Sequence, residues 1–120
     1  MREEIRDPLR LIHILQAAKN IQRFMQDKSL EDLKDDSLLF YGVVKNIEII
    51  GEAFYKLTKE FKLKYSQIPW ASIEKMRHIL VHEYYNTSPI EIFNVYTQDL
   101  PILIPQIEKI EAELKESNNK

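Results

Sequence analysis

Cysteine is absent from the 120 residues. Its absence excludes disulfide bonds and thiolate metal ligands and is typical of proteins of the reducing cytosol, so we predict a cytoplasmic location. Only two glycines occur, whereas Leu, Ile, Glu and Lys are frequent, which favours helices. No run of eighteen apolar residues is present, so we expect no membrane association. The charged N-terminal stretch also lacks the apolar segment of a secretory signal.

The chain has no strong excess of either charge, because 17 Lys and Arg face 19 Asp and Glu for a net charge of −2. This balance argues against a protein that coats nucleic acid through its total charge. A local basic strip is still compatible with it, and Arg77, Lys75 and Lys45 are the candidates. Since 44% of the residues are apolar, the chain can build one core. We predict a single domain over residues 1–120, with a frayed polar tail at 114–120.

Apolar residues recur every three or four positions in four stretches, which predicts amphipathic helices. The stretches run over about residues 5–25, 40–61, 70–84 and 88–114. The narrow apolar stripe of the second stretch fits antiparallel packing in a bundle. The predicted fold is therefore all-α, an antiparallel bundle of four to five helices.

Capping signals mark the connections between these helices. Residues 26–36 concentrate charge and are predicted to connect the first two helices, with Ser29 or Asp36 as a cap. Ser88 and Glu91 have the spacing of a capping box at the start of the last helix. The apolar stripe of that helix continues past two internal prolines, which predicts one kinked helix or two nearly collinear ones.

Two features of the predicted helices are unusual. Gly51 lies on the second helix beside its apolar stripe, where a missing side chain would let a neighbouring helix approach closely. On the third helix, Arg77 falls among apolar residues instead of on an open face. Polar residues follow the opposite side of the second helix and form either a solvated face or a wall toward a site or a second subunit. These are Lys45, Glu48, Glu52, Tyr55 and Lys59.

The third helix contains a candidate reactive group of residues, Arg77, His82 and Tyr84. A metal site on His78 and His82, at positions i and i+4, is one interpretation, but only one other histidine exists, so we predict no metal. Nucleophilic hydrolysis is a second interpretation, and no serine or threonine lies within a turn of His82 to support it. No other feature of the sequence indicates a cofactor.

Cleavage of RNA without a metal is the third interpretation. Arginine offers a planar fork for phosphate oxygens. Histidine can take a proton from a ribose 2′-hydroxyl or return one to the leaving oxygen. Five residues separate Arg77 from His82, so the two side chains point about 140° apart on an ideal helix. Arginine's reach, a helix that ends near His82, or a second subunit would bring them together. A purely structural role also remains open, with Arg77 in an ion pair to Glu48 or Glu52.

The pattern Arg77-x4-His82-x-Tyr84 resembles the signature of HEPN-domain toxins, specifically the HepT-like family. The resemblance extends over roughly residues 40–105. The segments that carry it are Asn46–Ala53, Ile68–Trp70, Met76–Arg77, Leu80–His82 and Asp99–Pro101, which stand in the family's order and spacing.

This resemblance implies a HEPN-like bundle that forms a homodimer, with the motif helices of two subunits around one cleft. It implies a metal-independent ribonuclease toxin of a type VII-like toxin–antitoxin system, acting on RNA and not on DNA. The implied partner is a nucleotidyltransferase antitoxin of the MntA type. Carried over by position, Arg77 would hold the phosphate, His82 would act as acid or base, and Tyr84 would receive AMP, which would block RNA by bulk and charge.

Supporting roles in RNA binding are assigned to Lys45, Glu52, His78 and Tyr85. The sequence departs from the family pattern at two of these positions. His78 follows the motif arginine where a small polar residue is common, and Lys45 stands where arginine is common, which keeps the charge but not the fork. An alternative function is a non-catalytic helical partner, or substrate-presenting subunit, of a nucleotidyltransferase.

Overall fold

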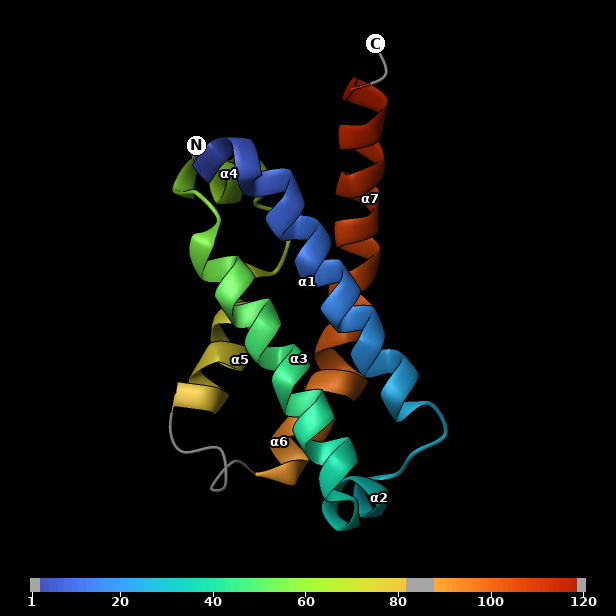
Figure 1. Cartoon of the computed structure of the whole chain (residues 1–120). Coiled ribbons are helices and arrows are strands. Elements are labelled where there is room, and N and C mark those ends of the chain that lie inside the picture. Colours follow the sequence, from blue (N-terminus) through green and yellow to red (C-terminus); the bar gives the residue numbers. More distant parts are fainter. Residues whose placement is uncertain (1–2, 82–87, 119–120) are drawn as a thin grey trace.

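The computed structural model describes residues 3–81 and 88–118, with side chains for 6–79 and 88–117, and this part of the chain is almost entirely helical (Figure 1). The prediction of an all-α fold is therefore confirmed. The helices are α1 (Glu3–Met25), α2 (Leu30–Asp35), α3 (Ser37–Lys56), α4 (Lys59–Lys64), α5 (Trp70–Val81), α6 (Pro89–Asn94) and α7 (Leu100–Asn118), with a π-helical turn η2 (Val95–Asp99) before α7. Among the described helices, none is long and apolar enough to cross a membrane.

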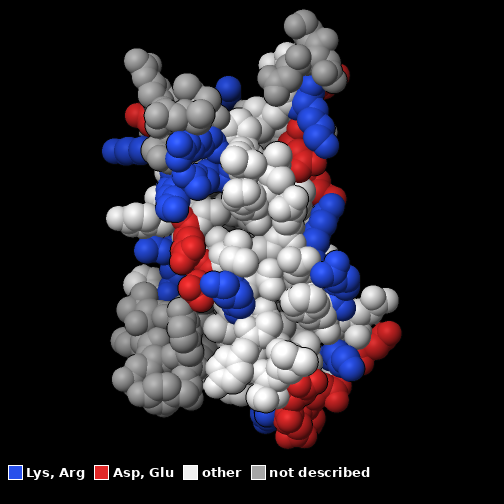
Figure 2. Space-filling model, viewed as in Figure 1, with Lys and Arg blue, Asp and Glu red and all other residues white. Residues whose placement is uncertain are grey.

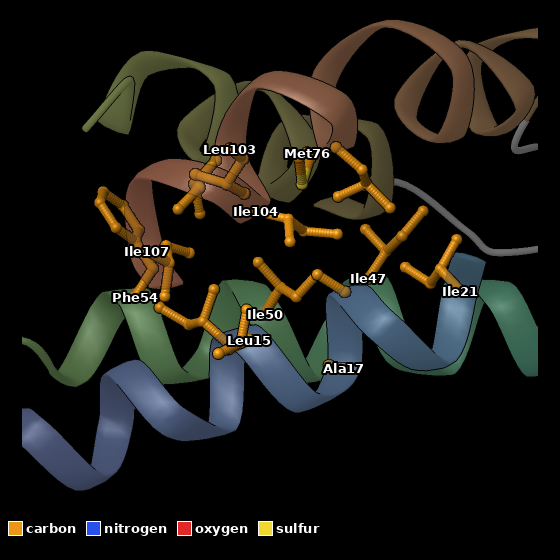
Figure 3. Packing of buried hydrophobic residues seen from close by; sticks show 14 of the residues in the cluster. Leu15, Ala17, Ile21, Ile47, Ile50, Phe54, Met76, Leu103, Ile104 and Ile107 are labelled. Carbon is orange, nitrogen blue, oxygen red and sulfur yellow. The ribbon is translucent and has the colours of Figure 1, made fainter. Parts of the chain in front are cut away.

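The long helices pack in two layers (Figure 1). Helices α1 and α3 lie side by side with opposite chain directions, α7 packs against α1, and α5 packs against α3. Buried apolar side chains from both layers meet in one core between them (Figure 3). Those labelled there are Leu15, Ala17 and Ile21 of α1, Ile47, Ile50 and Phe54 of α3, Met76 of α5, and Leu103, Ile104 and Ile107 of α7. The predicted bundle is thus built from helix stripes, as the sequence periodicity indicates.

The predicted second helix is divided into α3 and α4, which corrects the expectation of one helix over 40–61. The backbone becomes extended at Leu57, and Thr58 begins α4 as its N-cap. The buried Asp7 of α1 accepts hydrogen bonds from the Thr58 backbone N–H (3.0 Å) and hydroxyl (2.6 Å). Leu57 and Phe61 stay buried on either side of the break, so the apolar rhythm continues through it.

The predicted connection at residues 26–36 contains the additional short helix α2. Ser29 caps this helix with a complete capping box to Asp32, and Asp36 caps α3 by accepting from the Leu39 N–H. Both predicted caps are therefore confirmed. Near α6, Ser88 is the N-cap, but its side chain makes no capping hydrogen bond, so the predicted capping box there is wrong.

The last predicted helix is continuous from Pro89 to Asn118, with η2 as a π-helical turn inside it. The Leu100 N–H donates to the Val95 carbonyl, five residues back. Pro101 follows directly and lacks an N–H, and in a regular α-helix its ring would press on the carbonyl four residues earlier. The wider π turn relieves this conflict and keeps both halves on one apolar stripe.

Candidate functional site

The structure describes part of the predicted site. Arg77 and His78 lie on α5, and Lys45 and Glu52 lie on α3. His82, Tyr84 and Tyr85 fall in the segment 82–87, outside the described residues, so their predicted roles stay predictions.

Arg77 is placed by Gly51. A Cβ atom added to Gly51 would lie 2.7 Å from Cγ of Arg77, and all of its nearest neighbours belong to this side chain. The aliphatic part of Arg77 therefore rests directly on the backbone of α3. The close approach predicted at Gly51 is confirmed, and its partner is an arginine stem. This contact explains within one subunit why an arginine occupies the packing stripe of α5, since its apolar stem is packed while its charge reaches the surface.

The guanidinium group of Arg77 is held by two contacts at the surface. Its Nη1 lies 3.4 Å from Oε1 of Glu74, one turn earlier on α5, and its Cζ lies 4.9 Å from the ring centroid of Tyr55 on α3. Among the described residues, its carboxylate partner is thus Glu74 and neither Glu48 nor Glu52. The Arg77 side chain remains 34% exposed. A phosphate oxygen can therefore reach it in competition with a weak, solvent-screened ion pair.

Lys62 is a second cation that interacts electrostatically with Arg77 and Glu74. Lys62 of α4 places its Nζ 4.1 Å from the centroid of the Phe54 ring. Burial lowers the pKa of the Lys62 ammonium group, the Glu74 carboxylate opposes this shift, and Arg77 adds to it. Figure 2 shows basic side chains gathered over α4 and the start of α1, and acidic ones over α2. A local group of basic side chains is thus present although the total charge of the chain is slightly acidic.

Among the residues that the structure describes, the other predicted site residues are not joined to Arg77. Lys45 is 65% exposed and pairs with Glu48 of its own helix at 3.7 Å. Glu52 lines a separate hollow of about 170 Å³ between α1 and α3, with Arg10, His13 and Lys56. His78 is exposed. Lys75 pairs with Asp99 of η2 at 2.9 Å, so its charge is already matched.

No metal site is found in the described residues, where no three His, Asp or Glu side chains cluster closely enough to hold an ion. Glu74 and Lys62 are neighbours of Arg77 that were not predicted from the sequence. The i, i+3 spacing of Glu74 and Arg77 indicates the first of these contacts. The approach of α4 to α5 depends on the α3–α4 break, which the sequence periodicity does not reveal.

Residues 14–110 match the sequence profile of a family described as ribonuclease HepT-like. The chain belongs to this family. A candidate RNase from Caldanaerobacter subterraneus subsp. tengcongensis is 37% identical to this HepT-like chain over 100 residues, which cover 83% of it and 89% of that protein. A protein named as a probable ribonuclease HepT, from Thermococcus cleftensis, is 30% identical over 97 residues, with 81% and 88% covered.

A longer relative comes from Methanocaldococcus jannaschii and is named as a gamma-glutamylcyclotransferase and candidate RNase. It is 37% identical over 121 residues, covering all of this chain and 54% of that protein, so the chain spans about half its length. No solved structure matches the chain. The HepT-like family and HEPN-type helical fold predicted from the sequence are thus confirmed.

Proposed function

We propose that this HepT-like protein is an endoribonuclease that cleaves RNA without a metal ion, with Arg77 and His82 as its catalytic residues. One observation carries the proposal: the Arg77 guanidinium is presented at the surface while its stem is fixed over Gly51. An arginine fixed in this way offers a pre-oriented fork for a phosphodiester. The ribonuclease description of the family supports RNA as the substrate.

The reaction needs only groups that RNA and the protein supply. A neutral imidazole of His82 takes the proton of a ribose 2′-hydroxyl, and the 2′-oxygen attacks the adjacent phosphorus. The bond from phosphorus to the 5′-oxygen breaks, and that oxygen takes a proton from an imidazolium. The products are a 2′,3′-cyclic phosphate and a 5′-hydroxyl. Arg77 binds the non-bridging oxygens, where negative charge grows in the transition state.

The proposed active form is a homodimer. Arg77 and His82 point about 140° apart on an ideal helix, so the residues of one subunit fit one site poorly. With two copies of the motif around one cleft, the Arg77 of one subunit and the His82 of the other can act on the same phosphodiester, and one imidazole serves as base while the other serves as acid.

The proposed regulation is transfer of AMP to Tyr84 by a nucleotidyltransferase antitoxin. Tyr84 is two residues from His82, so an adenylate there adds a negative charge and a bulky group beside the catalytic histidine. Both effects exclude the RNA backbone, by charge repulsion and by volume. A free toxin is active in this scheme and a modified one is silent.

Cleavage of RNA in excess EDTA tests the proposal. Wild-type protein should cleave, whereas Arg77→Ala and His82→Ala should lose activity with unchanged helical content. Cleavage that requires an added divalent metal would refute the mechanism. Intact RNA after incubation with unmodified dimer, together with tight binding to a nucleotidyltransferase, would favour the non-catalytic partner role. An increase of one or more AMP units in intact mass, mapped to Tyr84, tests the regulation.

A further inference from the structure

Tyr55 is an exposed aromatic residue beside the proposed phosphate-binding arginine. It lies in the last turns of α3, and 69% of it is accessible to solvent. The Arg77 guanidinium carbon lies 4.9 Å from its ring centroid, within the range of a cation–π contact. Little of the ring is buried, so packing in the core does not account for a large aromatic residue here.

We propose that the Tyr55 ring stacks a nucleobase of the RNA, next to the phosphate that Arg77 holds. This inference rests on the proposed ribonuclease function and adds a base-binding position to it. Unpaired bases of RNA are commonly bound on aromatic rings and on the planes of arginine side chains. Tyr55 supplies an aromatic ring and Arg77 supplies a guanidinium plane, and the two groups contact each other.

The Tyr55 ring itself favours a base over a second phosphate. It is uncharged and 69% exposed, and Arg77, which contacts it, is the group assigned to the phosphate. An uncharged base can lie against an aromatic ring, whereas a phosphate is bound by a cation. The RNA contact next to the Arg77 phosphate is therefore aromatic in character.

Binding to RNA and to abasic RNA separates stacking from phosphate contacts. Binding is measured in a His82→Ala background, so that the RNA is not cleaved. Fluorescence anisotropy with a labelled single-stranded oligonucleotide gives Kd. Adding Tyr55→Ala should raise Kd by roughly 5- to 150-fold, the range for loss of one base–aromatic stack. Tyr55→Phe should bind like its parent. On an abasic oligonucleotide with the same number of phosphates, Tyr55→Ala should change Kd less than 2-fold.

Tyr41→Ala is the matched control, because Tyr41 is 52% exposed on the same helix, about 21 Å from Tyr55 along its axis. It should bind both oligonucleotides like the parent. Equal RNA affinity with and without Tyr55→Ala would overturn the inference, and so would an equal loss on the abasic oligonucleotide, which would mean that Tyr55 only positions Arg77. A fall in oligomer mass in Tyr55→Ala would also overturn it, since the ring would then belong to a subunit interface.

Wild-type cleavage separates this inference from the function on which it rests. If wild-type protein cleaves RNA and Tyr55→Ala in that background cleaves equally well, the base-stacking role is wrong and the ribonuclease stands. If wild-type protein neither cleaves nor binds RNA, the proposed function fails and the stacking role with it.

Discussion

Replacing Gly51 with alanine tests how the structure positions Arg77. The added Cβ would lie 2.7 Å from Cγ of Arg77, closer than non-bonded carbons approach, so the arginine side chain must move. Crowding in a packed contact costs about 1–3 kcal/mol. Alanine recovers about 0.8–1 kcal/mol over glycine in a helix interior. The free energy of unfolding should therefore fall by about 0–2 kcal/mol.

Gly51→Ala should also reduce RNA cleavage, and this effect should be larger in free energy than the loss of stability. If displacement removes the Arg77 hydrogen bonds to phosphate, worth about 1.5–3 kcal/mol for a charged group, kcat/KM should fall by about 10- to 150-fold. Gly42→Ala is the matched control on the same helix, because its Cβ would lie 3.7 Å from the Phe24 ring, an ordinary contact. It should raise stability by about 0.8 kcal/mol and leave cleavage unchanged.

A double-mutant cycle isolates the contact. In an Arg77→Ala background the crowding atoms are gone, because the remaining Cβ of residue 77 lies 3.8 Å from the new methyl group. Gly51→Ala should then stabilise the protein by about 0.8 kcal/mol, as in the control. Thermal and urea unfolding measure all four proteins. If Gly51→Ala stabilises the wild-type background like Gly42→Ala and leaves cleavage intact, Gly51 does not position Arg77.

Three further predictions concern the scaffold around the site. Asp7→Ala should lower the free energy of unfolding by about 1–3 kcal/mol in urea titrations, because the half-buried Thr58 loses both hydrogen bonds, and no loss would contradict this role. Asn46→Ala should cost a similar amount of about 1–3 kcal/mol, since buried Asn46 accepts from Asn20 and donates to the Gly42 carbonyl, and a neutral result would mean that water replaces it. Hydrogen bonds from the Ser29 backbone and hydroxyl lower the pKa of Asp32. The capping box should therefore stabilise the folded protein fully at pH values above the unfolded pKa of 3.8, and this stabilisation should be lost as the pH falls through the lower pKa of the folded state. Ser29→Ala should raise the pKa of Asp32 part of the way back to its ordinary value, because only the side-chain hydrogen bond is removed. An NMR titration measures this, and an unchanged pKa would refute the contribution of the Ser29 hydroxyl.

The regular part of the fold is predictable because its causes are local. Three–four apolar spacing follows from the helix repeat, and it places Ile47, Ile50 and Phe54 in the core as observed. Ser29 and Asp36 are recognisable as caps because a cap bonds to backbone only a few residues away. The break between α3 and α4 is different, since Asp7 stabilises it from 51 residues away and the apolar rhythm continues through it.

The candidate site follows the same division. Arg77 is identifiable from the motif. A close helix contact at Gly51 is also predictable, because a glycine beside the apolar stripe has no side chain to keep a neighbouring helix away. That the two meet depends on how α3 and α5 are placed, and this is set by the whole core. Glu52 belongs to the polar face of α3 as predicted, yet it lines the hollow toward α1. It follows Gly51, which faces Arg77 of α5, and adjacent helix positions point about 100° apart.

In the proposed mechanism, RNA supplies its own nucleophile to a site formed by Arg77 and His82. The most direct test is a short RNA incubated with purified protein in EDTA, compared with the same strand carrying 2′-deoxyribose at the cleaved nucleotide. The RNA should be cut to a 2′,3′-cyclic phosphate and a 5′-hydroxyl, the deoxy strand should stay intact, and His82→Ala should cut neither. Cleavage of the deoxy strand, or full activity of His82→Ala, would contradict the proposed mechanism.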